Sequence, residues 1–500
     1  MRSMLPRVAP LALACAAAMS PLQASEVEPG LRAEAERAGT VSTLIVLEAK
    51  APKQLLSPQG NYLERRRELV NMLRATAEVT QADLRMWLDA QGIAYRPFWI
   101  VNMIEAELTP TQIDALTARG DIAKIESNRA VGLQRPWAGP LPDASAEGTS
   151  AHAPQATEWG VNKVRAPMVW AEGFNGQGVV VAGQDTGIRW THNAIKGKYR
   201  GWNGISADHN YNWHDAIHDT GSSCGANSLV PCDDHSHGSH TVGTIVGDDG
   251  GSNQVGVAPG AKWIGCRNMN SGNGTPATYN ECAEWFLAPT DLNGQNPDPD
   301  RAPDVINNSW GCTTSEGCTA GNEVSEAIQN LVAGGIVFVA SAGNDGSGCQ
   351  TIFSQPGTLD AAFVVGSMTS SDSMSGFSSR GPVPGLAEVK PDVIAPGSSV
   401  RSITNSSDAA YGSMSGTSMA GPHVAGVVAL MMSVDPSLKG DPARVEQILR
   451  ETSVPISDSQ ICGGIPATTF PNPVQGMGRV DAWNAYLRAS DVIFVDSFDN

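Results

Sequence analysis

The segment Gly416-Thr417-Ser418-Met419-Ala420-Gly421-Pro422-His423-Val424-Ala425-Gly426 carries the clearest structural signal in this 500-residue chain. Small residues precede Ser418, and an apolar run follows it at 424–432. This pattern predicts a buried helix with Ser418 at its N-terminus. The positive end of the helix dipole would stabilise an anion that forms there. A glycine and serine turn that only opens a core helix gives the same pattern, so the segment needs partners before it indicates chemistry.

Two upstream segments place polar side chains at the ends of predicted elements. The run 179–182 is typical of a short buried strand, and Asp185 follows at its carboxyl end before a glycine turn. His237 lies beside a glycine and ahead of an apolar stretch with helical spacing. The order along the chain is therefore Asp185, His237, Ser418, with enough residues between each pair for several strand and helix units.

A serine hydroxyl needs a neutral imidazole to take its proton and a buried carboxylate to orient that imidazole. Asp-Thr-Gly at Asp185, His-Gly-Ser-His at His237 and Gly-Thr-Ser-Met-Ala around Ser418 resemble the motifs of the subtilisin-like (subtilase) serine peptidases, which have this chain order. The resemblance implies that Asp185 orients the imidazole, His237 is the general base and Ser418 is the nucleophile. It implies a serine endopeptidase that hydrolyses peptide bonds through an acyl-enzyme.

The same resemblance implies an oxyanion donor. The strand-like run 335–340 leads into Ser-Ala-Gly-Asn, and the family places a side-chain amide at that asparagine, so Asn344 is the candidate. An Asn-Asp-Gly turn is the alternative interpretation.

The substrate segments also come from the resemblance. Ser309, Trp310 and Gly311 follow the run 304–308 and resemble the family's edge segment, which pairs with an extended substrate. Trp310 replaces a smaller residue, so we expect a smaller or reshaped subsite several residues before the scissile bond. The second wall contains no acidic residue, so an apolar to neutral pocket is expected before the cleaved bond; this wall consists of Ser341, Ala342 and Gly343.

The similarity covers residues 158–486 and is closest to the bacillopeptidase F branch, through the segments 173–176, 198–203, 256–259, 272–279 and 377–382. The implied chemistry requires no cofactor. A structural calcium ion stays open, because Asn193-Ala194 stands where many subtilases have an aspartate ligand shortly after His192. The loop Asp248-Asp249-Gly250-Gly251 has oxygen ligands for a hard cation, but a solvated acidic loop also explains it.

Residues 1–24 have the features of a signal peptide: Arg2 and Arg7 precede an apolar stretch at 8–19, and Leu22-Gln23-Ala24 is a cleavage site. We therefore expect a secreted protein, extracellular or periplasmic, with no membrane anchor. The formal charge of −18 and pI near 4.9 argue against a nucleic-acid partner. The expected partners are protein or peptide substrates and the chain's own propeptide, and the expected state is a monomer.

Eight cysteines lie beyond the signal, and an even number in an exported chain predicts disulfides rather than metal ligation. The close pairs Cys224 with Cys232 and Cys312 with Cys318 are expected to clip surface loops, and Cys266 with Cys282 is suggested. Sequence leaves the pairing open; the remaining two cysteines are Cys349 and Cys462.

Residues 25–133 contain no cysteine and are predicted to form a separate small domain. The expected elements are a strand at 41–49, a helix at 62–91, an extended stretch at 93–108 with a turn near Arg96-Pro97, a capped helix from Thr109 to Gly120, and a strand at 122–126. This β-α-β-β-α-β order predicts a ferredoxin-like α+β unit.

In subtilases this place is held by a propeptide, which the resemblance implies is an intramolecular chaperone and inhibitor. A mainly parallel sheet folds slowly, so a docking surface that is already folded can lower the barrier. A binding domain retained in the mature protein is the alternative. Residues 134–157 form a linker, rich in Pro, Ala, Ser and Gly, where processing would fall.

Residues 158–490 alternate β-branched runs with helical stretches, which predicts a three-layer α/β domain with a mainly parallel sheet. Ligands bind at the carboxyl ends of such strands, so the candidate residues should converge there. The tail 491–500 is either a surface strand or an export or sorting tag.

Two other classes of function are alternatives. His235, His237 and His240 follow Asp233-Asp234, and a metallohydrolase with this histidine cluster as its ligands and the acidic insert around it is the first alternative. It leaves the serine and asparagine motifs unexplained, and the chain has no His-Glu-x-x-His pattern; His240 is expected to be structural. A binding protein without activity on the same scaffold is the third possibility.

Overall fold

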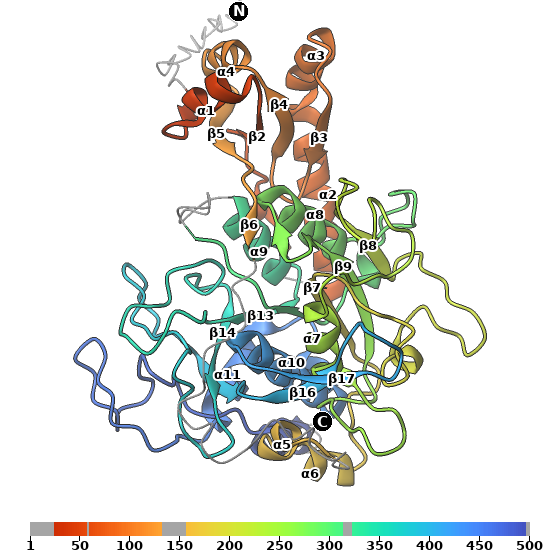
Figure 1. Cartoon of the computed structure of the whole chain (residues 1–500), viewed down its shortest axis with the longest axis vertical. Helices are drawn as coiled ribbons and strands as arrows, with labels where there is room; N and C mark the ends of the chain where they lie inside the picture. Colours follow the sequence, from red (N-terminus) through yellow and green to blue (C-terminus); the bar gives the residue numbers. More distant parts are fainter. Residues whose placement is uncertain (1–24, 58–59, 133–156, 314–322, 497–500) are drawn as a thin grey trace, which may run out of the picture.

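The computed structural model describes residues 25–57, 60–132, 157–313 and 323–496, and of 491–496 it describes only the backbone. The predicted signal peptide and nearly all of the predicted linker lie outside these residues. A small N-terminal unit lies above a larger α/β unit in the view of Figure 1.

The N-terminal unit contains a five-stranded sheet in the order β1-β5-β2-β4-β3. Without β1 and α1, which the sequence did not indicate, this is the predicted β-α-β-β-α-β arrangement, and α4 begins at the predicted capping box of Thr109 and Gln112. The elements are β1 Glu26–Val27, α1 Leu31–Ala38, β2 Val41–Leu47, a 3₁₀ helix Lys53–Leu55, α2 Tyr62–Thr80, α3 Ala82–Ala90, β3 Tyr95–Phe98, β4 Met103–Leu108, α4 Pro110–Thr117, β5 Ile122–Ser127 and β6 Val131–Gly132.

Two details of this unit differ from the prediction. The single helix expected at 62–91 is divided into α2 and α3 at Gln81, whose buried amide donates to the carbonyl oxygens of Phe98 and Met103. The turn expected near Arg96-Pro97 is also wrong. Pro97 lies within β3, opposite Ile104 of β4, and the position is tolerated because β3 is an edge strand.

The larger unit is built on a seven-stranded sheet in the order β15-β14-β13-β12-β7-β9-β8. Every pairing between neighbouring strands is parallel, as predicted. The strands are β7 Val180–Asp185, β8 Trp213–Asp215, β9 Lys262–Arg267, β12 Val305–Asn308, β13 Val337–Ser341, β14 Phe363–Met368 and β15 Val393–Pro396.

Helices cover both faces of this sheet, which confirms the predicted three-layer architecture. Successive residues of β12 alternate between two apolar clusters: Val305 packs in the cluster of α7 and α10, and Ile306 packs in the cluster of α8 and α9. The helices are α5 Trp159–Lys163, α6 Ala166–Ala171, α7 His237–Val246, α8 Pro276–Leu287, α9 Glu323–Ala333, α10 Thr417–Val434, α11 Pro442–Thr452 and α12 Ala482–Asp496.

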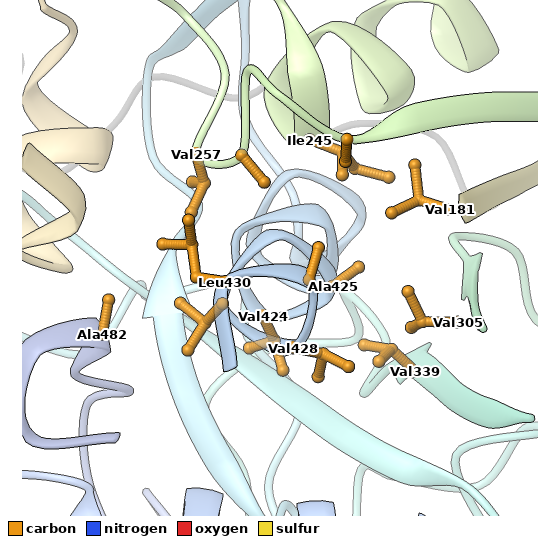
Figure 2. Packing of buried hydrophobic residues seen from close by; sticks show 14 of the residues in the cluster. Val181, Ile245, Val257, Val305, Val339, Val424, Ala425, Val428, Leu430 and Ala482 are labelled. Carbon is orange, nitrogen blue, oxygen red and sulfur yellow. The ribbon is translucent and has the colours of Figure 1, made fainter. Parts of the chain in front are cut away.

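Helix α10 lies at the centre of the first cluster, surrounded by side chains from the sheet, from α7 and from α12 (Figure 2). A Cβ at Gly426 would lie 2.5 Å from the Cβ of Val257, so glycine permits the close approach of that loop. Among the described residues, α10 has the length and hydropathy of a membrane span, but 94% of it is buried. It is therefore the core helix of this domain.

Smaller elements complete the domain. Strand β6 of the N-terminal unit joins a three-stranded sheet in the order β10-β11-β6. The other elements are β10 Met269–Asn270, β11 Asn273–Gly274, the hairpin β16 Val400–Ile403 and β17 Tyr411–Met414, and the 3₁₀ helices Lys196–Lys198, Pro299–Arg301 and Pro436–Leu438. The part of the predicted tail that the structure describes, 491–496, is not a strand, because α12 continues to Asp496, and the remaining tail residues lie outside the described residues.

Three disulfides lie within the described residues. Cys224–Cys232 forms as predicted, and Cys266–Cys282 forms as suggested. The third, Cys349–Cys462, joins residues 113 apart in sequence, and nothing in the spacing indicated it. Cys318, the predicted partner of Cys312, lies outside the described residues.

Candidate active site

Ser418 is the second residue of α10 and is 3% exposed. Its hydroxyl donates to the carbonyl oxygen of Ser309 at 3.0 Å, and the Ser309 hydroxyl donates back to the Ser418 carbonyl at 3.0 Å. Pro422, inside the helix, has no N–H for the carbonyl four residues earlier, which is that of Ser418. Because of Pro422, the Ser418 carbonyl is left to accept from the Ser309 hydroxyl, and this bond holds Ser418 against the end of β12.

Asp185 and His237 form a buried pair. Asp185 is the last residue of β7, and His237 is the first residue of α7. The His237 Nδ1 lies 2.8 Å from Oδ1 and 2.9 Å from Oδ2 of Asp185. The end of β7 and the start of α7 thus bring an imidazole against a carboxylate.

The surroundings of His237 favour its protonated form. Burial lowers the pKa of His237, but the charge and hydrogen bonds of Asp185, with a further contribution from Asp233, raise the pKa above its usual value. His240 differs, because burial lowers its pKa to about 3. Its Nε2 lies 2.9 Å from the Val400 carbonyl and 3.2 Å from that of Gly412, so the His240 ring connects α7 to the β16–β17 hairpin.

The structure does not join His237 to Ser418 by a hydrogen bond. The His237 Nε2 is buried and has no hydrogen-bond partner among the residues described, while the Ser418 hydroxyl points to Ser309. Helix α7 nevertheless packs directly on α10. Both side chains lie in the first turn of their helices.

Asn344 lies beside the start of α10, three residues after the end of β13. Its Oδ1 accepts from the Thr417 N–H at 2.8 Å and from the Thr417 hydroxyl at 3.0 Å. These bonds fix the plane of the amide, in which Nδ2 is the group that can donate to an oxyanion. Gly343 makes the turn possible because its φ of +105° is in a region that favours glycine.

The two predicted substrate segments lie at the carboxyl ends of neighbouring parallel strands: Ser309 to Gly311 follow β12, and Ser341 to Gly343 begin at the last residue of β13. Trp310 is 2% exposed with the N-terminal unit in place. Its ring stacks on Tyr279, with centroids 3.7 Å apart and planes 11° apart. The tryptophan therefore belongs to the packed layer beneath the surface.

The last strand of the N-terminal unit pairs with the larger unit. Val131 of β6 pairs with Gly274 of β11 in antiparallel register, and Val131 is fully buried. Strand β11 lies between β9 and α8 in the chain, and β9 neighbours β7, which ends at Asp185. The strand that precedes the predicted processing linker is thus held as an added strand on β11.

The metal alternative gains no support from the arrangement of side chains. Among the described residues, no group of three or more His, Cys, Asp or Glu side chains is arranged to hold a metal ion. The Asp248 and Asp249 carboxylates accept from backbone N–H groups of their own loop, namely Gly250 and Gly251. Asp233, which the sequence suggested only as part of a metal cluster, instead binds the first turn of α7. Its position just before the His237 motif was the signal that could have identified it.

Comparisons with known proteins agree with this geometry. The sequence profile of the Subtilase family matches residues 176–478. Bacillopeptidase F of Bacillus subtilis (strain 168) is 34% identical over 458 residues, which are 88% of this chain but 30% of that protein. Subtilisin DY of Bacillus licheniformis is 33% identical over 307 residues, 61% of this chain and 94% of that protein. The major intracellular serine protease of Bacillus subtilis (strain 168) is 31% identical over 55% of this chain and 75% of its own length. The chain therefore belongs to the subtilase family of serine endopeptidases.

Proposed function

We propose that this protein is a secreted endopeptidase, made as a zymogen, that cleaves peptide bonds of protein or peptide substrates through a Ser418 acyl-enzyme. The observation that carries the proposal is the buried Asp185–His237 pair, in which His237 Nδ1 lies 2.8 Å from Asp185 Oδ1. His237 is on α7, which packs against α10, the helix of Ser418. Asp185 ends β7, and Ser309 and Asn344 follow β12 and β13, which are strands of the same parallel sheet. Parallel sheets bind ligands at the carboxyl ends of their strands, which supports the proposal.

In the proposed mechanism, the Ser418 hydroxyl turns from the Ser309 carbonyl to His237 Nε2 when substrate binds. Catalytic hydrogen bonds are often loose before that step. His237 takes the proton as Ser418 Oγ attacks the scissile carbonyl, and Asp185 stabilises the resulting imidazolium. The Ser418 N–H and Asn344 Nδ2 donate to the oxyanion. His237 then protonates the leaving amine, and water releases the acyl group by the same route in reverse.

We propose that residues 25–133 are an inhibitory propeptide. Strand β6 adds to β11 in antiparallel register, which is how an extended peptide adds to the edge of a sheet. The buried Arg66 guanidinium of α2 donates to the Gly334 carbonyl at 2.6 Å, so the two units share a close interface. The match to bacillopeptidase F covers more of the chain than the catalytic region contains, and so includes part of this unit.

The remaining proposals concern conditions of action. We propose export by the segment 1–24, processing within 134–157, and a monomeric mature enzyme that needs no cofactor for its chemistry. The disulfides Cys224–Cys232, Cys266–Cys282 and Cys349–Cys462 support an extracellular or periplasmic location, because such bonds persist in oxidising compartments.

Replacing the nucleophile tests the proposal directly. Ser418→Ala is expected to abolish peptide hydrolysis and to leave the full-length proprotein uncut, because both need the same hydroxyl. N-terminal sequencing and mass measurement of the secreted product give the readout, with wild type as the control. Hydrolysis retained by Ser418→Ala would reject Ser418 as the nucleophile. Normal maturation of this variant alone would mean that another protease removes the propeptide.

Asn344→Ala tests the oxyanion role. The amide is expected to act mainly in the transition state, so kcat should fall by about 10²–10³-fold while KM changes little. Thr417→Ser keeps the hydroxyl that holds the Asn344 amide and should retain most activity. Steady-state kinetics on a peptide substrate give both constants. A loss confined to KM would remove Asn344 from the oxyanion hole.

A further inference from the structure

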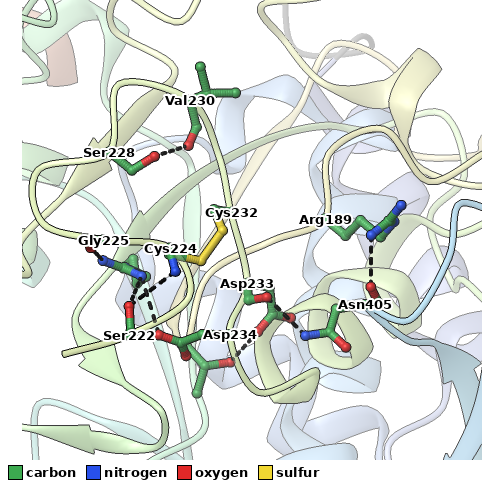
Figure 3. The surroundings of a disulfide bond; sticks show 12 residues. Arg189, Ser222, Cys224, Gly225, Ser228, Val230, Cys232, Asp233, Asp234 and Asn405 are labelled. Atoms are coloured by element: carbon green, nitrogen blue, oxygen red, sulfur yellow. Dashed lines mark hydrogen bonds and ion pairs between the residues drawn. A yellow bond between two sulfur atoms is a disulfide. The ribbon is translucent and has the colours of Figure 1, made fainter. Parts of the chain in front are cut away.

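Asp233 is a buried carboxylate that the proposed mechanism does not use. It directly follows the Cys224–Cys232 loop and lies beside Asn405 (Figure 3). Its two oxygens accept five hydrogen bonds, all between 2.5 and 3.0 Å, from the Thr186 hydroxyl, the N–H groups of His235, Ser236 and Ser239, and the Ser239 hydroxyl. One carboxylate therefore joins the residue after Asp185 to the turn that carries His237.

The backbone of that turn is strained at Ser236, the residue directly before His237. Ser236 has φ of +79°, in the left-handed region, which costs a non-glycine residue on the order of 1 kcal/mol. The bond from the Ser236 N–H to Asp233 holds this conformation. Asn405 assists, since its N–H donates to the Ser236 hydroxyl at 3.1 Å and its amide donates to the Asp233 carbonyl at 2.9 Å.

The Thr186 hydroxyl links the Asp233 carboxylate to the backbone that follows His237. It donates to Asp233 Oδ1 at 2.9 Å and accepts from the Gly238 N–H at 3.0 Å. Thr186 follows Asp185, and Gly238 follows His237. The backbones on both sides of the Asp185–His237 bond are thus fixed through one hydroxyl and one carboxylate.

We propose that Asp233 is a positioning residue for peptide hydrolysis: its carboxylate fixes the strained turn before His237 and so sets the alignment of the imidazole for proton transfer from Ser418. The proposal rests on the function proposed above, in which His237 is the general base. Displacement of a catalytic group by about 1 Å can cost on the order of 10²-fold in rate, so an alignment device of this kind has a measurable effect.

A second effect is electrostatic. The charged groups that face His237 are Asp185 on β7 and Asp233, and both raise the pKa of His237, whereas the neighbouring His240 stays neutral. Burial raises the pKa of Asp233, whereas its hydrogen bonds with Ser239, His235 and Ser236 lower it and favour the ionised form. Removing this charge should therefore lower the pKa of His237.

Asp233→Asn is the primary test. It keeps the shape of the side chain but directs an amide N–H₂ toward donors. The expected result is a fall in kcat of about 10–100-fold, KM within about twofold of wild type, and an acid limb of the pH–rate profile displaced to lower pH. Where self-cleavage is slow, the variant is matured with a thermolysin pulse quenched by phosphoramidon, and rates are normalised to titrated Ser418.

The matched control is Asp435→Asn, another buried carboxylate that caps a 3₁₀ helix by accepting from Ser437 at 2.9 Å. It lies at the far end of α10, about 25 Å along the axis from Ser418. This control should lower Tm with kcat and the acid limb unchanged. If Asp233→Asn gives only that result, or loses activity through KM alone, Asp233 has a merely structural role and the proposal is overturned.

Thr186 provides a second test if Asp233→Asn does not fold. Thr186→Val removes the connecting hydroxyl and should lower kcat by about tenfold, while Thr186→Ser should restore it. Equal kcat in both variants would contradict the proposal. Ser418→Ala separates the two hypotheses: if it is inactive while Asp233→Asn equals wild type, only this inference fails. If Ser418→Ala remains active, the triad itself is wrong.

Discussion

Single residues shape the site by deciding which backbone groups lack a helical hydrogen-bond partner and which backbone conformation precedes a catalytic side chain. Pro422 leaves the Ser418 carbonyl without its helical partner, and the Ser309 hydroxyl takes that place at 3.0 Å. Ser236 adopts a left-handed conformation directly before His237. Ser418 lies in the first turn of α10 and Ser236 directly before α7, where the first N–H groups of each helix lack helical partners.

The pH dependence of catalysis follows from His237. Burial alone would lower its pKa, but Asp185 raises it to above the ordinary histidine value of about 6.5. The general base works only when neutral, so kcat/KM should rise with pH with a midpoint above 6.5. If removal of the N-terminal unit exposes His237, burial lowers the pKa of His237 less, and that pKa stays above its usual value. A pH–rate profile of the mature enzyme measures the midpoint, and a value below 6 would contradict the role of Asp185.

Among the helices of the larger unit, the N-terminal unit meets α8, α9 and the 3₁₀ helix Pro299–Arg301 (Figure 1). Glu284 of α8 accepts from the N–H groups of Trp99 and Ile100 at 2.6 and 3.0 Å, in the loop between β3 and β4. Asn330 of α9 donates to the Ile100 carbonyl at 2.6 Å. The turn predicted near Arg96-Pro97 lies instead in the loop between β3 and β4, and α8 and α9 bind this loop by hydrogen bonds.

Glu284 makes this interface sensitive to pH. Burial, with a smaller contribution from the charge of Glu281, raises the pKa of Glu284 to about 7. The two backbone hydrogen bonds and the charge of Arg74 act in the opposite direction. Since an unfolded glutamate titrates near 4.3, the stability that protonated Glu284 contributes is complete below about pH 4.3 and lost as pH rises through 7. In the uncut Ser418→Ala proprotein, Glu284→Gln should therefore reduce the loss of unfolding free energy between pH 5 and 8, by at most about 3 kcal/mol.

Urea unfolding at the two pH values measures this difference. Glu326→Gln is the control, because Glu326 also contacts the N-terminal unit, through Lys50 at 2.6 Å, but is partly exposed. The control should leave the pH dependence of the parent unchanged. An identical slope in Glu284→Gln and the parent would show that Glu284 is not the titrating group.

At the scale of the whole molecule, the fold class and both sheet types were predictable because local patterns and global architecture agree. Strand runs ending at Asp185 and before Asn344 predicted a parallel sheet with its ligands at one edge. The hydroxyl direction of Ser418 was not predictable, because it depends on the Ser309 carbonyl, 109 residues away. The role of Asp233 likewise depends on Thr186, a contact that only the folded chain creates.

The long disulfide was beyond sequence reasoning for the same reason, and it has a consequence for the stability of the whole domain. Cys349–Cys462 closes a loop of 113 residues, whereas Cys224–Cys232 closes one of 8. Because a crosslink restricts the unfolded chain more when its loop is longer, loss of the first should cost about 2 kcal/mol more than loss of the second. The double variants Cys349→Ala/Cys462→Ala and Cys224→Ala/Cys232→Ala are compared by urea unfolding in the Ser418→Ala proprotein, which prevents self-digestion. Equal losses would mean that strain or packing at the two sites, rather than loop length, decides the contribution of each bond.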